Sequence, residues 1–283
     1  MSRRIGIVTC RELPEPDPDQ ELMLGALRQA GLDAQLLPWD DGSADPSGFD
    51  LCVLRSCWDY HRDPDRFMLW VDEAEQRTTL RNPAEVVRWN IHKRYLSDME
   101  AEGLPIVPTA FVDRGDFLPL DTVLAGMGWT DIVIKPCISA GSANTKRFHQ
   151  SEYEEADAFL FHHAETRDMM IQPYLPSVES GGERSIIWIG GEATHVIEKN
   201  PRFAGQDEHV SDAKPVEADE QEMIEKALSL ISEPLMYARL DTMIGPSGER
   251  LVSEFELIEP SLFLLQSEKA LTAFVSAVEQ LSS

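Results

Sequence analysis

The sequence predicts a mixed architecture, an α/β unit at the start of the chain followed by an α+β unit. Short β-branched runs alternate with helical periodicity over about the first 80 residues, which is typical of a small parallel sheet. Strands dominate the second half, where Gly190-Gly191 and the turn at 245–248 separate apolar runs as hairpin turns do. The length of 283 residues corresponds to about two domains at ~150 residues per domain.

The first unit is expected to span residues 1–82. Its first helix has leucines at near-helical spacing and stops at Gly31, a residue that suits a helix C-terminus. The unit ends before Pro83, because a residue that precedes proline favours extended backbone. The expected strands and helices are Arg4–Cys10, Gln20–Ala30 (helix), Ala34–Leu37, Leu51–Leu54 and Phe67–Glu75 (helix).

The remaining residues are expected to form a central lobe, 83–174, and a C-terminal lobe, 175–283. Residues 201–215, PRFAGQDEHVSDAKP, show no periodicity and are expected to form a long mobile loop. The expected helices are His92–Glu102, Glu152–His163, Glu220–Ile231 and Ala270–Leu281. The expected strands are Ile106–Phe111, Ile132–Lys135, Met169–Gln172, Arg184–Ile189, Ala193–Lys199, Leu235–Ile244 and Arg250–Ile258.

The chain is strongly acidic, since 25 Lys and Arg against 50 Asp and Glu give a formal charge of −25. Such a charge repels phosphates, so nucleic acid and anionic membrane surfaces are excluded as expected partners. A hydrophobic content of 42% with 27% charged residues indicates a folded core. Residues 85–147 are an exception, with 7 basic and 8 acidic residues, and an anion is best tolerated there.

The cysteines predict a reducing environment. Cys10, Cys52, Cys57 and Cys137 are scattered without a CxxC pair, and residues 1–10 contain no secretory leader, so the expected location is cytoplasmic. No stretch approaches the ~20 apolar residues of a membrane span. The oligomeric state, including a homodimer, is left open.

Charged residues alternate on two neighbouring strands of the expected second half. Arg239 and Asp241 lie two residues apart, as do Glu254 and Glu256, and side chains at this spacing share one face of a strand. Three carboxylates and an arginine would then converge on one hairpin. Mg²⁺ binds through a few carboxylates together with substrate phosphates, so the hairpin is a candidate metal platform. The alternative is a solvated strand face.

Two lysines and a strand end extend this set. Lys135 ends the apolar strand DIVIKP and precedes the small-residue loop Ser139–Thr145, whose backbone N–H groups could approach phosphates closely. Lys93, in WNIHKRYL, is expected at a helix start. The segment Gln172–Leu175 (QPYL) ends a strand and could contact an adenine edge through its backbone. Either lysine alone would be interpreted as a surface charge, and no Walker A motif is present.

In order and spacing, these motifs resemble those of the ATP-grasp ligases, especially the glutathione synthetase and D-alanine–D-alanine ligase type. The resemblance covers roughly residues 83–275, and residues 1–80 fit the parallel pre-ATP-grasp domain that usually precedes this fold. The strings RSCWDYH (55–61), WNIHKRYL and EFELIEPSLF are similar to a narrower glutathione synthetase-like subgroup that includes the cycloserine-forming ligase. The predicted fold is therefore an ATP-grasp fold behind an N-terminal parallel-sheet domain.

The resemblance also implies roles for individual residues. ATP phosphates would be held by Lys93, Lys135 and the loop residues Gly141 and Ser142. Adenine would contact Gln172, Pro173, Tyr174 and Leu175, and ribose would contact Glu179 or Glu183. Two Mg²⁺ ions would be held by Asp241, Glu254 and Glu256, while Arg239 and Lys199 would act on the reacting groups. Glu256 departs from the asparagine usual in the family, and residues 201–215 lack an expected glycine pair.

A polar and aromatic loop in the first unit provides candidate substrate contacts. It follows the strand at 51–54, at the end of a parallel sheet where ligands usually bind. The candidates are Arg55, Ser56, Trp58, Asp59, Tyr60 and His61, together with Glu259 beyond the charged hairpin. Trp58 could instead fill the seam between the lobes.

These observations favour an ATP-dependent carboxylate–amine ligase that forms an acyl phosphate and releases ADP and phosphate. Such phosphoryl transfer needs charge neutralisation and positioning more than a protein nucleophile, and no GxSxG or HExxH motif occurs. ATP and Mg²⁺ are the expected cofactors, and a small carboxylate and an amine are the expected substrates. Three alternatives remain, namely a ligase that closes an amino-acid-derived ring, a nucleotide-binding regulatory module without activity, and a peptide-modifying ligase, which the acidic surface disfavours.

Overall fold

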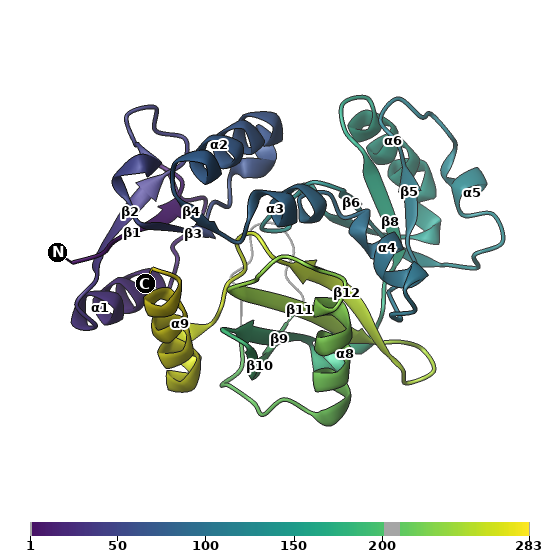
Figure 1. Ribbon diagram of the computed structural model, residues 1–283. Coiled ribbons are helices and arrows are strands. Elements are labelled where there is room, and N and C mark those ends of the chain that lie inside the picture. The colour runs from purple at the N-terminus through teal and green to yellow at the C-terminus, as the bar shows by residue number, and fades with distance from the viewer. Residues whose placement is uncertain (1, 201–209, 283) are drawn as a thin grey trace.

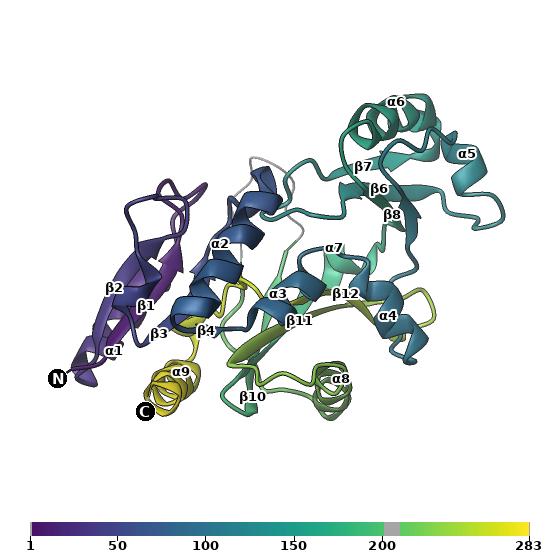
Figure 2. The same cartoon turned by 45° about the horizontal axis from the view of Figure 1, so that its top comes forward.

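The structure, a computed structural model, describes residues 2–200 and 210–282. Three four-stranded sheets organise the described residues, one parallel and two antiparallel (Figure 1). The larger antiparallel sheet lies between the parallel sheet and the smaller antiparallel sheet in both views (Figures 1 and 2). No helix among the described residues is both long and apolar enough to cross a membrane.

The N-terminal parallel sheet has the strand order β2-β1-β3-β4 and carries helices on both faces. Ile5 and Ile7 of its first strand pack on the face covered by the first helix, whereas Val8 packs on the opposite face with Phe67 of the second helix. The second helix begins at Pro64, earlier than expected, because the Asp63 carboxylate accepts a hydrogen bond from the Arg66 N–H and caps it. The elements are β1 (Arg4–Thr9), α1 (Gln20–Gln29), β2 (Asp33–Pro38), β3 (Leu51–Ser56), α2 (Pro64–Arg77) and β4 (Thr79–Arg81).

The middle sheet is antiparallel, with the order β10-β9-β11-β12, and it confirms both expected hairpins. One face carries Ile187, Ile197 and Tyr237 against the C-terminal helix, and the other face packs against further helices. Its elements are β9 (Glu183–Ile189), β10 (Glu192–Lys199), α8 (Ala218–Leu228), β11 (Tyr237–Ile244), β12 (Arg250–Glu256) and α9 (Glu268–Leu281).

Helix α9 joins the first and last parts of the chain. It lies beside α1 in both views (Figures 1 and 2). Phe274 of α9 is fully buried in one cluster with Ile5 of the parallel sheet and Ile187 of the middle sheet. The expected C-terminal lobe therefore shares its core with the N-terminal unit.

The smaller sheet is antiparallel, with the order β5-β8-β6-β7, and its helices cover the face turned away from the middle sheet (Figure 2). Ile132 and Ile134 of β6 point into the core under these helices, which leaves Val133 and Lys135 on the inner face. Strand β7 was not expected, because its sequence KRFH has one apolar residue. The elements are β5 (Ala110–Val112), α5 (Leu120–Val123), β6 (Asp131–Pro136), β7 (Lys146–His149), α6 (Tyr153–Ala164) and β8 (Met169–Pro173).

The structure differs from two expectations for residues 83–111. The helix expected over 92–102 is confirmed as α4 (Tyr95–Ala101), but a further helix, α3 (Ala84–Asn90), precedes it and was not expected. Leu96 of α4 and Val86 of α3 pack in the core of the middle sheet, whereas Val87 of α3 packs in the core of the parallel sheet. The strand expected over 106–111 begins only at Ala110, since Pro105 and Pro108 have no N–H to donate to a strand pair.

The remaining connections are short or only partly described. Residues 201–209 of the loop expected over 201–215 lie outside the described residues, and the end of that loop pairs with β10 through bridges from Val210 to Lys199 and from Lys214 to Val196. Helix α7 (Ser177–Gly181) and the 3₁₀ turns Pro46–Gly48, Tyr60–Arg62, Gln150–Glu152 and Leu264–Gln266 complete the described elements.

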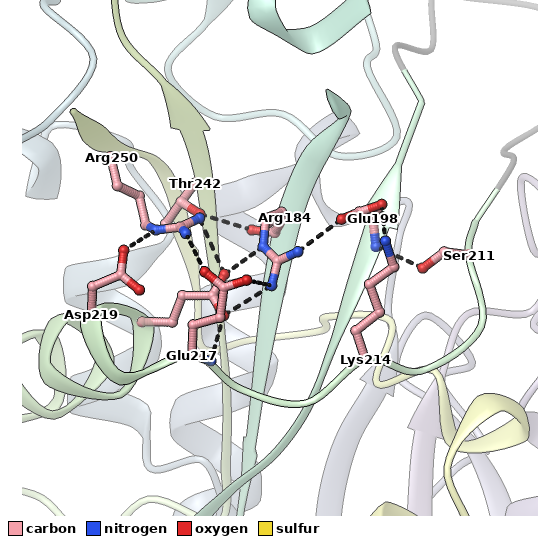
Figure 3. Close-up of polar contacts among 9 residues, drawn as sticks. Arg184, Glu198, Ser211, Lys214, Glu217, Asp219, Thr242 and Arg250 are labelled. Atoms are coloured by element: carbon pink, nitrogen blue, oxygen red, sulfur yellow. Dashed lines mark hydrogen bonds and ion pairs between the residues drawn. The ribbon is translucent and has the colours of Figure 1, made fainter. Parts of the chain in front are cut away.

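Two arginines fasten α8 to the middle sheet (Figure 3). Arg184 of β9 bonds Glu220 through its Nε at 2.5 Å and Glu198 of β10 through its Nη1 at 2.8 Å. Arg250 of β12 bonds Asp219 at 2.9 Å and approaches Glu220 at 3.1 Å. Glu220 is fully buried, so its charge depends on these two guanidinium groups.

Candidate active site

A cavity of about 280 Å³ is lined by the inner face of the smaller sheet, by the middle sheet and by the loop that follows the parallel-sheet strand β3. Its lining brings together most of the residues singled out from the sequence. These are Trp58, Tyr60, Lys93, Lys135, Gly141, Ser142, Gln172, Pro173, Tyr174, Leu175, Glu183, Lys199, Arg239, Asp241, Glu254, Glu256 and Glu259.

The register of β11 and β12 accounts for the charged floor of the cavity. Arg239 lies opposite Glu256 and Asp241 lies opposite Glu254, so the four side chains share one face, as their spacing predicts. The same face carries Tyr237 two residues earlier, where α9 covers it. One sheet face is therefore apolar beneath α9 and charged where it borders the cavity.

Asp241 is 1% exposed and is held by two cations. Arg239 donates to both of its carboxylate oxygens at 2.9 Å, and Lys199 Nζ lies 2.7 Å from Oδ2. Burial alone would raise the pKa of Asp241, but Arg239 and Lys199 outweigh it and hold the pKa well below its usual range. Asp241 is thus a carboxylate anion despite its burial.

Lys199 links β10 to the start of β9. Its Nζ lies 3.1 Å from Oε2 of Glu183, whose other oxygen accepts a hydrogen bond from Ser253 at 2.6 Å. The chain enters β9 through Gly182 with a φ of +72°, and a Cβ there would lie 2.8 Å from the Lys199 carbonyl oxygen. Only glycine fits this approach, which sets Glu183 beside Lys199.

Lys93 approaches the same floor from the turn between α3 and α4. Its Nζ lies 2.9 Å from Glu254 and donates to the Ser139 carbonyl at 3.0 Å, and its own N–H donates to the Cys137 carbonyl. Burial opposes the charged form of Lys93, but Glu254 more than offsets this and raises the lysine pKa. Lys93 therefore connects the charged hairpin to the small-residue loop.

Lys135 faces the hairpin from β6 on the opposite wall. Its side chain makes no hydrogen bond or ion pair with any residue that the structure describes. Burial lowers its pKa, and Lys93 nearby acts in the same direction against the attraction of Glu254. An anionic ligand in the cavity would favour the charged form of Lys135 and so offset both its burial and the repulsion from Lys93.

Two further glutamates line the cavity, and the pKa of each is raised. Burial, together with repulsion by Glu254 and Asp241, raises the pKa of Glu256 to about 7, although Arg239 donates to it at 2.5 Å. Burial, followed by repulsion from Glu256, raises the pKa of Glu259 to about 8. The cavity is therefore short of cations at this end.

The three predicted metal ligands contact lysine and arginine side chains instead of forming a cage. Among the described residues, no group of three or more His, Cys, Asp or Glu side chains is arranged to hold a metal ion. Asp241, Glu254 and Glu256 nevertheless offer only oxygen donors, the type that Mg²⁺ takes, and Mg²⁺ usually completes its shell with phosphates and water. The donor set fits Mg²⁺ that arrives with a nucleotide.

The other end of the cavity is apolar. Val107, Val133, Val178 and Met243 line it beside the QPYL segment, in which Gln172 donates to the Thr109 hydroxyl at 3.0 Å. Such a wall suits the flat face of a purine ring.

Glu179 does not line the cavity, whereas Glu183 does. Glu179 instead accepts hydrogen bonds from the Tyr174 hydroxyl at 2.8 Å and from Arg147 at 3.1 Å, and Arg147 lies over the Tyr174 ring. Glu179 therefore lies outside the cavity and holds the cavity-lining Tyr174 in position.

Four of the predicted substrate contacts also lie outside the cavity lining. Strand β3 extends to Ser56, so Arg55 and Ser56 are buried within the sheet, where Arg55 donates to the Pro260 carbonyl at 2.5 Å and Ser56 donates to Thr9. Asp59 accepts a hydrogen bond from the Trp39 indole, and His61 packs against Tyr60.

Two lining residues that the sequence analysis did not select support the charged hairpin. Asn90 donates to the Phe255 carbonyl at 2.7 Å and accepts from the Leu257 N–H, and the Tyr95 hydroxyl accepts from the Phe255 N–H. They lie about 160 residues from β12 in sequence, and no local pattern marks them. The lining also includes Glu15, Ser139, Asn200 and Ser261.

Comparisons with known proteins agree with this geometry. Residues 5–82 match the family model described as the N-terminal domain of D-cycloserine synthetase DcsG. The cycloserine biosynthesis protein DcsG of Streptomyces lavendulae is 30% identical over 280 residues, covering 93% of this chain and 94% of that protein. The crystal structure of D-cycloserine synthetase DcsG superposes with a TM-score of 0.89 at 29% identity, over 98% of this chain and 99% of the other.

A more distant likeness concerns the fold. D-alanine–D-alanine ligase from Bacillus anthracis, solved with ATP, has a TM-score of 0.68 at 18% identity, over 99% of this chain and 97% of the other. The chain therefore belongs to the family of D-cycloserine synthetase DcsG within the ATP-grasp ligases, and it is an ATP-dependent ligase that joins a carboxylate to an amine.

Proposed function

We propose that this chain phosphorylates a small carboxylate with ATP inside the described cavity and passes the acyl group to an amine, releasing ADP and phosphate. The observation that carries this proposal is the set of four cations around one cavity: Lys93, Lys135, Lys199 and Arg239. Phosphoryl transfer to a carboxylate brings several negative groups together, and fixed cations stabilise that charge.

The nucleotide has a defined orientation in this proposal. Adenine occupies the apolar end beside Gln172–Leu175, ribose lies near Glu183, and the phosphates lie between Lys135, Lys93 and the loop Ser139–Thr145. Lys135 supports this arrangement because its ammonium group has no other partner among the described residues. The loop also covers the phosphates and keeps water from the acyl phosphate.

Mg²⁺ would be held by Asp241, Glu254 and Glu256 together with the nucleotide, and we propose two ions. Bound there, it would neutralise phosphate charge and orient the transferred group. The arginine and lysine that pair with these carboxylates would then be available to phosphate and acyl oxygens, with Arg239 stabilising the oxygen that becomes charged when the amine attacks.

A second candidate is the ring-closing version of the same reaction, in which the attacking amine belongs to the substrate itself. It is favoured by the relative named D-cycloserine synthetase, which aligns over almost the whole chain, including the N-terminal domain. The retained charged floor argues against a regulatory module without activity, since nucleotide binding alone would not need Arg239 beside three carboxylates.

The proposed partners are small molecules, and the charge of −25 argues against nucleic acid and anionic membranes. We also infer a reducing, cytoplasmic setting, which is supported by four cysteines that are all free and buried. A homodimer remains open.

The test is ADP release from Mg-ATP with panels of small carboxylates and amines, with the products analysed by mass. We expect ADP release that requires the carboxylate, and ring closure would appear as loss of water without a second amine. Glu254→Gln should lower kcat by at least about 100-fold, and Lys135→Met should weaken ATP binding by about tenfold or more. Exposed Glu222→Gln on α8 is the matched control. No substrate-dependent ADP from the wild type, or full activity in Glu254→Gln, would contradict the proposal.

A further inference from the structure

We propose that Glu259 sets substrate specificity by binding a protonated amine of the substrate, so that the cavity selects substrates with an ammonium group at this end. The inference rests on the proposed function, since it assigns the end of the cavity opposite the nucleotide. Glu259 lines the cavity, as do Trp58, Tyr60 and Ser261, and it is 7% exposed.

The charge pairing of the cavity identifies Glu259 as the carboxylate that lacks a cation. Asp241 is paired with Arg239 and Lys199, and Glu254 is paired with Lys93. Two further carboxylates are also paired with a cation, since Glu256 contacts Arg239 and Glu183 contacts Lys199. Glu259 forms no ion pair with any residue in the described ranges 2–200 and 210–282. A buried carboxylate of this kind is favoured by a cationic ligand.

The backbone around Glu259 is held in place before any ligand arrives. Three successive carbonyls accept hydrogen bonds: Ile258 from the Tyr237 hydroxyl at 2.8 Å, Glu259 from the Trp58 indole at 3.0 Å, and Pro260 from Arg55 at 2.5 Å. These donors belong to β11, β3 and the loop that follows β3. This arrangement keeps the carboxylate at the cavity end without the entropy loss of ordering a loop on binding.

The aromatic neighbours indicate which cation fits. Tyr60 is 4% exposed and stacks on Phe67 with ring centroids 5.2 Å apart, so its position is fixed, and Trp58 also lines the cavity. Aromatic faces attract an alkylammonium group. Mg²⁺ instead requires a shell of oxygen ligands, which these rings do not supply. A carboxylate beside aromatic rings therefore favours ammonium over a metal ion and over a neutral hydroxyl.

The experiment compares small α-amino acids, such as D- and L-alanine and D- and L-serine, with the matching α-hydroxy acids lactate and glycerate. Thermal shift with saturating Mg-ADP detects binding without turnover, and ADP release from Mg-ATP gives kcat and KM where turnover occurs. We expect an amino acid to raise the Tm of the wild type and its hydroxy acid to leave it unchanged. Glu259→Gln should weaken amino-acid binding on the order of 100-fold, mostly in KM, and keep the Mg-ADP shift. Glu222→Gln is the matched control.

Several results would overturn the assignment. They are equal binding of amino and hydroxy acids, no shift with any amino acid, and unchanged amino-acid affinity in Glu259→Gln. A weaker Mg²⁺ dependence in Glu259→Gln with intact amino-acid binding would assign the residue to the metal and would also overturn it. A wild type that gives no Mg-ADP shift would instead count against the proposed function, so the two failures are distinguishable.

Discussion

Buried ionisable residues outside the cavity make the stability of this protein depend on pH. His195 on β10 is 3% exposed, and its Nδ1 lies 2.9 Å from the Thr194 hydroxyl. Its Nε2 has no hydrogen-bond partner in the part of the chain that the structure describes. Burial lowers the pKa of His195 from 6.5 to about 4, although Asp19 acts in the opposite direction.

The folded state should lose stability as the pH falls from about 6.5 toward about 4, because the unfolded chain takes up a proton on His195 first. Between pH 7.5 and pH 5 the loss is about 2 kcal/mol from this residue, at 1.36 kcal/mol per pKa unit. His195→Gln should remove that part of the pH dependence in urea unfolding, whereas His162→Gln, at an exposed position, should keep it. Parallel pH profiles of His195→Gln and the wild type would contradict the assignment.

At the scale of elements, the middle sheet and α8 are connected through one buried carboxylate. Glu220 lies at the first turn of α8, where it also accepts a hydrogen bond from the Glu217 N–H, and Arg184 and Arg250 approach it from two different strands. Since Arg184 directly follows Glu183, the same strand start supports both this contact and the cavity. The helix is therefore anchored to the strands that carry the site.

Arg184→Ala should destabilise the protein by about 3 kcal/mol, because it removes one of the two guanidinium partners of a fully buried glutamate. Lys214→Ala is the control. Lys214 pairs with Glu198 at a partly exposed position, and its loss should cost at most about 1 kcal/mol. Urea unfolding at pH 7.5 measures both, and equal effects of the two substitutions would show that burial of Glu220 does not govern the cost.

At the scale of the whole molecule, α9 closes the chain into one structure. Phe274 and Val278 of α9 pack with Met23 of α1, Ile7 of the parallel sheet and Ile189 of the middle sheet. The N-terminal unit and the middle sheet thereby share one core. Carbonyls of residues 258–260 are bonded by side chains of both parts, so the shared core also fixes the substrate end of the cavity.

Phe274→Ala should cost about 3–5 kcal/mol, since it leaves a cavity in this shared core. Leu69→Ala on α2 removes a side chain that is 71% exposed and should change stability by no more than about 0.5 kcal/mol. We expect intrinsic fluorescence and far-ultraviolet circular dichroism to report the same denaturant midpoint for Phe274→Ala. Two separated transitions would show that the parallel sheet and the middle sheet unfold independently.

Local patterns in the sequence predicted most of the strands and the charged hairpin. Arg239, Asp241, Glu254 and Glu256 converge because alternation with period two is a property of the strand itself, and turn residues set the hairpin. The same period placed Lys135 on the opposite face from the core residues of β6. Family motifs then predicted the ATP-grasp fold, which the comparisons confirm.

Only the tertiary structure decided which residues from distant segments meet. Glu183 lines the cavity, whereas Glu179, Arg55 and Ser56 do not. Asn90, which is distant in sequence, is hydrogen-bonded to Phe255 of β12. Helices α3 and α4 pack with residues of the middle sheet, and α9 packs with residues of the N-terminal unit, so all three contact a part of the chain outside their expected lobe. Such contacts depend on the apolar surfaces that pack together across the whole chain, and periodicity within one segment carries no information about its partner.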